Sequence, residues 1–284
     1  MRSVRALAVG FTGLALVLAG CTAPGATLPA GVTVSVFQNR FDYSLRVLEL
    51  EVANGTSAPI TVTSASFVSS RFATPATWDT PQLIPDAAAR DLKVQLPAPV
   101  CDNTTPKDRV TLAFTLADGT SGTATLTPTD EQGRVDAIND EDCLGVSAVA
   151  IAAITAPAET QWTPGAHEPA TVTISVVPTG AVGTLTIHYA KGTVLLSLFD
   201  EATGQPYDMK LDRVVDAQSG PSVIPLEVVP ARCDAHAVEE DKRGTFFPLE
   251  VETSDGRSGK IYVGVSDQVR RSLYEFYGDY CGLP

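Results

Sequence analysis

Apolar and polar residues alternate over much of the chain, which is the period expected of half-buried β-strands. The clearest case is the stretch 110–116, where Val, Leu, Phe and Leu alternate with smaller or polar residues. It ends at Asp118-Gly119, a tight-turn dipeptide, and a second alternating stretch follows at 123–127. This pattern predicts an antiparallel hairpin.

Similar patterns recur on both sides of this hairpin. Residues 45–52 and 60–63 flank Asn54-Gly55 and predict another hairpin, and residues 92–96 predict a further strand. In the second half of the chain, the predicted strands are residues 171–177, 185–189, 194–199, 223–229, 246–253 and 260–265.

Two segments change to a helical period. After Ser266, a suitable N-cap, apolar residues recur at three- and four-residue spacing up to Gly278, which predicts one short amphipathic helix. The stretch 130–142 carries Val135 and Ile138 on one side and predicts its counterpart in the first half.

Four short landmarks occur twice, in the same order and at nearly constant separation. The pairs are Ala53-Asn54-Gly55-Thr56 with Ala190-Lys191-Gly192-Thr193, Pro99-Val100-Cys101-Asp102 with Pro230-Ala231-Arg232-Cys233-Asp234, Asp118-Gly119-Thr120-Ser121-Gly122 with Asp255-Gly256-Arg257-Ser258-Gly259, and Asp142-Cys143-Leu144-Gly145 with Asp279-Tyr280-Cys281-Gly282. Four matches in register indicate a duplicated domain.

Together these patterns predict an all-β fold of two tandem immunoglobulin-like antiparallel β-sandwiches. We place the first domain at residues 31–145 and the second at 146–284. Each sandwich would end in a short helix tied back by a disulfide. Repeated β-barrels are the alternative architecture.

The N-terminal segment has the three parts of an export signal. Arg2 and Arg5 precede an uncharged apolar run that is shorter than the roughly 20 residues needed to span a bilayer. The run ends in Leu18-Ala19-Gly20-Cys21, which resembles the lipobox of bacterial lipoproteins. The resemblance implies cleavage of residues 1–20, lipidation of Cys21 and anchoring to the outer face of the cell membrane; residues 21–30 would form a tether.

With Cys21 assigned to lipidation, the other four cysteines are expected to form two disulfides. The repeat selects Cys101 with Cys143 and Cys233 with Cys281, and an extracytoplasmic location favours disulfides. Zinc is the competing use of four cysteines, but the chain has no Cys-x-x-Cys.

The net charge of the chain and the absence of catalytic motifs limit the classes of function that the sequence supports. A net charge of −13 argues against binding to nucleic acid or to anionic headgroups. The chain has no Gly-x-Ser-x-Gly elbow, no His-Glu-x-x-His and no phosphate-binding glycine loop. We therefore expect a protein that is not an enzyme and has no cofactor.

The densest polar segment is residues 233–244. In a helical turn, His236 would share a face with Glu239 or Glu240 and could bind a cation or polarise a ligand. The alternative is purely structural: Asp234 caps the turn, its charges pair in solvent and Gly244 ends it.

Trp78 and Trp162 lie in loops rich in proline and threonine. An exposed indole there could stack on a glycan or anchor a partner protein. Alternatively, each indole closes one end of the core of its own domain.

The segment from Arg232 to Phe247, with Cys233-Asp234-x-His236, is similar to a motif of uncharacterised exported proteins of high-GC Gram-positive bacteria. The resemblance covers the last part of the chain and implies a compartment, not an activity. We predict a protein-interaction or scaffold module with an envelope protein or glycan as partner. The alternatives are a solute- or cation-binding lipoprotein serving a transporter, and an accessory subunit of an envelope enzyme.

Overall fold

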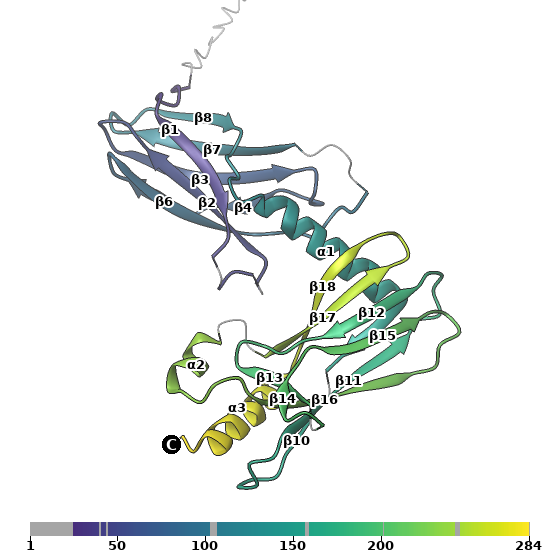
Figure 1. Cartoon of the computed structure of the whole chain (residues 1–284). Coiled ribbons are helices and arrows are strands. Elements are labelled where there is room, and N and C mark those ends of the chain that lie inside the picture. Colours follow the sequence, from purple (N-terminus) through teal and green to yellow (C-terminus); the bar gives the residue numbers. More distant parts are fainter. Residues whose placement is uncertain are drawn as a thin grey trace, which may run out of the picture.

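The computed structural model describes residues 25–39, 41–43, 45–102, 107–156, 159–200, 202–241 and 245–283. Two β-sandwiches follow each other along the chain, and helix α1 (Arg134–Ile151) runs from the first into the second (Figure 1). The prediction of antiparallel, mostly β domains is confirmed. Within the described ranges, no helix is long and apolar enough to cross a bilayer.

The first sandwich is built from two sheets with a shared core. One sheet has the order β1-β2-β6, and the other has the order β4-β3-β7-β8 with β5 also on β3. Inward side chains of both sheets, such as Leu50 and Leu112, are fully buried in one cluster. The strands are β1 (Val32–Phe37), β2 (Val47–Asn54), β3 (Ile60–Ser69), β4 (Ala76–Trp78), β5 (Gln82–Ile84), β6 (Ala88–Gln95), β7 (Asp108–Leu116) and β8 (Ser121–Leu126).

The second sandwich has the same plan with additions at one sheet. Its first sheet runs β10-β11-β16-β13-β14, with β9 on β11, and its second runs β15-β12-β17-β18. The strands are β9 (Ala152–Thr155), β10 (Thr160–Gln161), β11 (Ala170–Pro178), β12 (Leu185–Ala190), β13 (Leu196–Asp200), β14 (Gln205–Pro206), β15 (Met209–Val215), β16 (Ser222–Pro230), β17 (Phe246–Thr253) and β18 (Ser258–Gly264). The helices are α2 (Ala235–Glu240) and α3 (Asp267–Cys281).

Three of the four repeated landmarks occupy equivalent places in the two sandwiches. Both disulfides form, Cys101 with Cys143 and Cys233 with Cys281, and each ties a loop after β6 or β16 to a helix. The Asp118 and Asp255 turns join the last two strands of each domain. Such disulfides are typical of extracytoplasmic proteins.

The remaining landmark was wrongly matched. Asn54 ends β2, the second strand of its domain, whereas Lys191 follows β12, whose counterpart is β3. A short turn motif after a strand is common enough to recur at a similar separation by chance. The duplication therefore rests on the cysteines, the last turn and the sheet order.

The predicted hairpin across Asn54-Gly55 is also wrong, because β2 and β3 belong to different sheets. Asn54 is buried, and its side-chain amide donates to Ala58 O (2.9 Å), Ile84 O (3.2 Å) and Pro85 O (3.0 Å). The asparagine thus stabilises a crossing between sheets. By contrast, β7 and β8 form the hairpin predicted at Asp118-Gly119.

Helix α1 differs from the stretch 130–142 predicted for it at both ends. Asp130 stays outside, and its carboxylate accepts from the backbone N–H groups of Arg134 (2.8 Å) and Val135 (2.9 Å). The helix continues to Ile151 because Leu144, Ala148 and Ile151 are covered by the core of the second sandwich. The domain boundary expected after residue 145 falls inside this helix.

The second predicted helix is confirmed and runs slightly further than expected. The Ser266 hydroxyl accepts from Val269 N–H (3.2 Å), and Gly282 ends α3 in a left-handed conformation with φ of 62°. Residues 1–20 and Cys21 lie outside the described residues. Of the predicted tether, residues 25–30 are described, and Leu28 contacts the core of the first sandwich.

Candidate functional site: an interdomain groove

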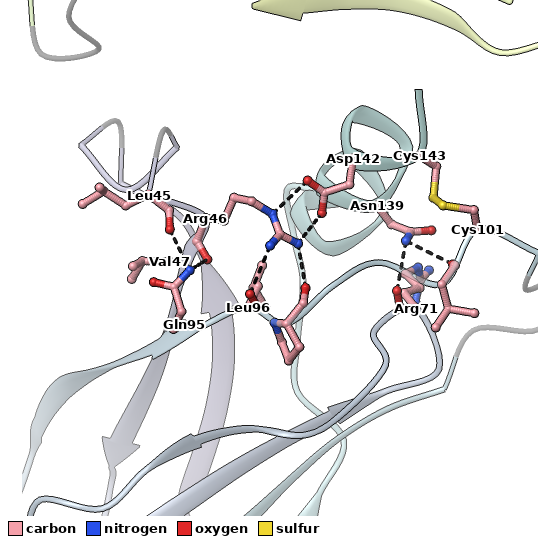
Figure 2. A network of polar contacts seen from close by, with 12 residues as sticks. Leu45, Arg46, Val47, Arg71, Gln95, Leu96, Cys101, Asn139, Asp142 and Cys143 are labelled. Atoms are coloured by element: carbon pink, nitrogen blue, oxygen red, sulfur yellow. Dashed lines mark hydrogen bonds and ion pairs between the residues drawn. A yellow bond between two sulfur atoms is a disulfide. The ribbon is translucent and has the colours of Figure 1, made fainter. Parts of the chain in front are cut away.

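Helix α1 is attached to the first sandwich by two sets of polar contacts (Figure 2). Arg46 Nε donates to Asp142 Oδ1 (2.9 Å), and Arg46 Nη2 donates to Asp142 Oδ2 (2.6 Å). The same guanidinium donates to the carbonyl oxygens of Leu96 (3.1 Å) and Pro97 (2.7 Å). A two-pronged pair of this kind fixes the direction of the helix as well as its position.

The second set of contacts lies beside the Cys101–Cys143 disulfide. Asn139 Nδ2 donates to Arg71 O (3.1 Å) and to Val100 O (3.3 Å), next to the bonded sulfurs (Figure 2). The Arg71 guanidinium is buried and pairs with Asp108 and Asp136. This half of the helix is therefore part of the first domain.

The other half of α1 is equally fixed to the second domain. Besides its buried apolar side chains, Ser147 Oγ donates to Asp255 Oδ2 (2.7 Å) at the β17–β18 turn. Hydrogen bonds from Thr253 and Ser147 lower the pKa of Asp255 to about 2. From the same turn, Arg257 Nη2 donates to Cys101 O (2.8 Å) in the first domain. Because one helix belongs to both cores, the two sandwiches are held in one relative orientation.

A groove of about 550 Å³ lies where α1, β9 and β18 meet. Its walls are largely apolar, with Val149 on α1, Ile154 on β9 and Ile261 on β18. Val149 (64% exposed) and Tyr262 (41%) line the groove, and Val146 (54%) is an exposed apolar residue of α1 outside its lining. Exposed apolar side chains at a groove are typical of a contact site.

Charged and aromatic residues of the first domain form the rim. Tyr43 and Arg46, from the loop between β1 and β2, line the groove together with Glu141 and Asp142 of α1. The Arg134 guanidinium lies over the Tyr43 ring, 4.5 Å from its centroid. Arg46 pairs with Asp142, and Arg134 pairs with Glu141 at 3.4 Å. Most rim charges are thus compensated within the chain.

A polar cluster around two buried carboxylates, Asp42 and Glu49, holds the rim loop in place. The Glu49 carboxylate is 1% exposed and accepts from Asn39 Nδ2 (2.6 Å). Lys93 Nζ lies 3.2 Å from carboxylate oxygens of both Asp42 and Glu49. Burial, and then the neighbouring Asp42 carboxyl, raise the pKa of Glu49 above its ordinary value of 4.5.

Glu49→Gln should make stability less sensitive to pH. Because the folded-state pKa of Glu49 is raised, its protonation favours the folded protein, and this stability is lost as pH rises from about 4.5 through the raised pKa. Glutamine keeps the acceptor for Asn39 and has no proton to lose. Urea titrations between pH 4 and 7 should therefore show the variant gaining stability relative to the parent as pH rises. Glu275→Gln, at an exposed position of α3, is the control and should follow the parent. Parallel curves for Glu49→Gln and the parent would refute the expectation.

The polar segment predicted as a possible binding site forms a capped helical turn. Asp234 Oδ1 accepts from Ala237 N–H (3.0 Å) and caps α2, as the structural alternative proposed. His236 and Glu239 do share a face, with Nδ1 and Oε2 3.5 Å apart, but their side chains are 82% and 76% exposed. Glu240 ends α2, and its side chain lies outside the described residues. The ligand role of this segment stays a prediction.

The two tryptophans lie in different domains and contact the core. Trp78 on β4 packs against the core of the first sandwich. Trp162 packs against that of the second, donates from Nε1 to Ser272 Oγ (3.2 Å) and meets the Phe276 ring edge-on at 5.8 Å. Each indole thus packs on the core of its own domain, and the binding role predicted for the two tryptophans stays a prediction.

The predicted candidates that the structure describes are thus spread over the molecule, and none of these lines the groove. In the part of the chain that the structure describes, no three His, Cys, Asp or Glu side chains are grouped to hold a metal ion. Sequence reasoning missed Tyr43, Arg46, Val149 and Lys260. No local motif marks them, because they come together only through α1 and the packing of two domains.

No protein-family model and no curated protein matches the chain. Among solved structures, it is similar to red sea bream transglutaminase, at 11% identity and a TM-score of 0.22 over 84% of this chain and 32% of that one. It is also similar to the B domain of a biofilm associated protein (9% identity, TM-score 0.21, 87% and 90% covered) and to the YadV chaperone (10%, 0.19, 77% and 92%). The chain thus spans about a third of the transglutaminase. At these TM-scores the similarity is distant, and neither a fold family nor a functional residue is transferred from it.

Proposed function

We propose that this chain is a non-enzymatic lipoprotein of the cell envelope that binds a partner protein in its interdomain groove. The lipobox-like segment ending at Cys21 supports the anchor, and the two disulfides support an extracytoplasmic location. The protein would present the groove at the outer face of the membrane as an interaction or scaffold module.

The observation that carries this proposal is the groove itself. Its walls combine apolar side chains with residues of two strands, β9 and β18, and its shape is set by a helix that both domains share. Preorganised apolar sites lose little conformational entropy on binding, which favours specific association. The charged residues at the rim, which pair with one another within the chain, would orient the partner without producing a strong electrostatic field.

A small solute for a transporter is the second candidate, and the position of the groove between the domains favours it. A solute site normally encloses most of its ligand and directs several polar groups at it. This groove is open along one side, and Arg46, Asp142 and Glu141 already pair within the chain. We therefore favour a protein partner.

Site-specific photo-crosslinking in intact cells tests the proposal. A benzophenone amino acid at Val149, inside the groove, should give one adduct larger than the chain by the mass of a protein. The matched control is Val214, which is 57% exposed on β15, at the opposite edge of the sheet that contains β18. Val214 should give no such adduct. Cys21→Ser should release the protein into the medium and remove the Val149 adduct.

Four results would count against the proposal. Equal labelling at Val149 and Val214, or no adduct at either, would exclude the groove as the partner site. An adduct heavier by only a few hundred daltons would identify a solute instead of a protein. Retention of Cys21→Ser on the membrane would exclude the lipid anchor.

A further inference from the structure

In the first sandwich, extended segments outside the named strands pair with the edges of β1 and β8. Beyond β8, Thr129 runs parallel to β1: Val36 N–H donates to Thr129 O (2.8 Å), and Thr129 N–H donates to Val34 O (3.0 Å). These bonds join the two sheets along one flank. Such pairing satisfies backbone groups that would otherwise face solvent at a sheet edge.

The start of β8 is covered in the same way. Ala26 N–H donates to Ser121 O (2.9 Å), and Ala26 lies so close over Gly122 that a β-carbon there would collide with it. Glycine at this position therefore permits a second extended segment to lie against β8. The flank of the first domain is occupied by its own chain.

The corresponding flank of the second sandwich is only partly covered. At Gly259, the counterpart of Gly122, a β-carbon would lie 3.2 Å from Leu144 Cδ2, so α1 covers the start of β18. Beyond it, Lys260–Gly264 line the groove, and in the described part of the chain no strand pairs with the outer edge of β18. This part of the β18 edge is about 13 Å long at 3.3 Å per residue.

We infer that the groove takes an extended peptide segment of the partner, which adds as a strand to β18 along Lys260–Gly264. This inference rests on the proposed function and specifies the form in which the partner binds. The added strand would pair with the outer edge of β18, as the extended segment at Ala26 pairs with the start of β8 in the first domain. Main-chain hydrogen bonds would supply affinity, and alternate side chains would supply specificity.

The charge pattern indicates which segments fit. Lys260 points outward and lies opposite Glu250 on β17, but the Glu250 carboxylate pairs with Lys191 at 3.0 Å. Lys260 has no ion pair among the described residues, in a chain whose net charge is −13. Inward positions of the added strand would face Ile154 and Val149. The segment should therefore be β-branched on one face and carry an acidic side chain on the other, opposite Lys260.

The test uses the full exported chain and three capped peptides, based on residues 31–38, a strand of suitable alternation. The first carries glutamate at the position of Ser35, the second carries lysine there, and the third is the glutamate peptide with alternate backbone nitrogens methylated. We expect the glutamate peptide to bind and to slow hydrogen exchange at residues 260–264. Methylation should weaken binding at least tenfold, because two or more main-chain hydrogen bonds are lost.

Charge reversal at Lys260 provides the matched control. Lys260→Glu, at an exposed position, should weaken the glutamate peptide and strengthen the lysine peptide, each by roughly two- to fivefold. Equal binding of methylated and unmethylated peptides would overturn strand addition. Failure of all three to bind, or protection elsewhere than β18, would also overturn it. None of these results affects the crosslink at Val149, which tests the proposed function separately.

Discussion

The double variant Cys101→Ser/Cys143→Ser should lower the free energy of unfolding of the first domain by about 4 kcal/mol, the value expected for freeing a loop of 42 residues. The disulfide ties the β6–β7 connection to α1, next to the bonds from Asn139. Loss of the disulfide should therefore also weaken the attachment of α1 to this domain.

Each domain contains one of the two tryptophans, so their unfolding can be followed separately. Urea titration of the double variant in a Trp162→Phe background reports on the first domain through Trp78. The control, Cys233→Ser/Cys281→Ser in a Trp78→Phe background, should shift the Trp162 transition by a similar amount, since its loop has 48 residues. An unchanged Trp78 transition in the first double variant would contradict the expected contribution of Cys101–Cys143.

Gly145→Pro should allow the two domains to move independently of each other. Residue 145 lies in the middle of α1, and proline there removes a helical hydrogen bond and clashes with the preceding turn, at a cost of about 3 kcal/mol or more. With the helix broken, the sandwiches should reorient independently and the groove should lose its shape. Residual dipolar couplings should then require a separate alignment tensor for each domain, whereas the parent needs only one.

Gly145→Ala is the matched control. A β-carbon at this position meets no atom within 4 Å, and alanine favours a helix interior over glycine by about 1 kcal/mol. This variant should be slightly more stable and keep one common tensor. The photo-crosslink at Val149 should persist in Gly145→Ala and be lost in Gly145→Pro. A single tensor in Gly145→Pro would show that contacts such as Arg257 with Cys101 suffice to fix the domains.

Most strands were predictable because their signal is local. Alternation along 110–116 with Asp118-Gly119 gave the right hairpin, and the serine at 266 gave the right helix start. The same alternation could not show that β2 and β3 part into different sheets, since inward and outward positions are identical in both arrangements. Strands such as β1 and β15 were missed, and the extent of α1 was set by burial against a domain that comes later in the chain.

By itself, the sequence determined the duplicated mostly β plan and the pairing of Cys101 with Cys143 and of Cys233 with Cys281, because these follow from period and repeated spacing. It also supports the expectation of export, through the segment that ends at Cys21. Only the tertiary structure decided that one helix serves two cores and that a groove opens beside β18. The physical reason is that the groove brings together Tyr43, Val149 and Lys260, which are distant along the chain and gain a common surface only when both domains pack on α1.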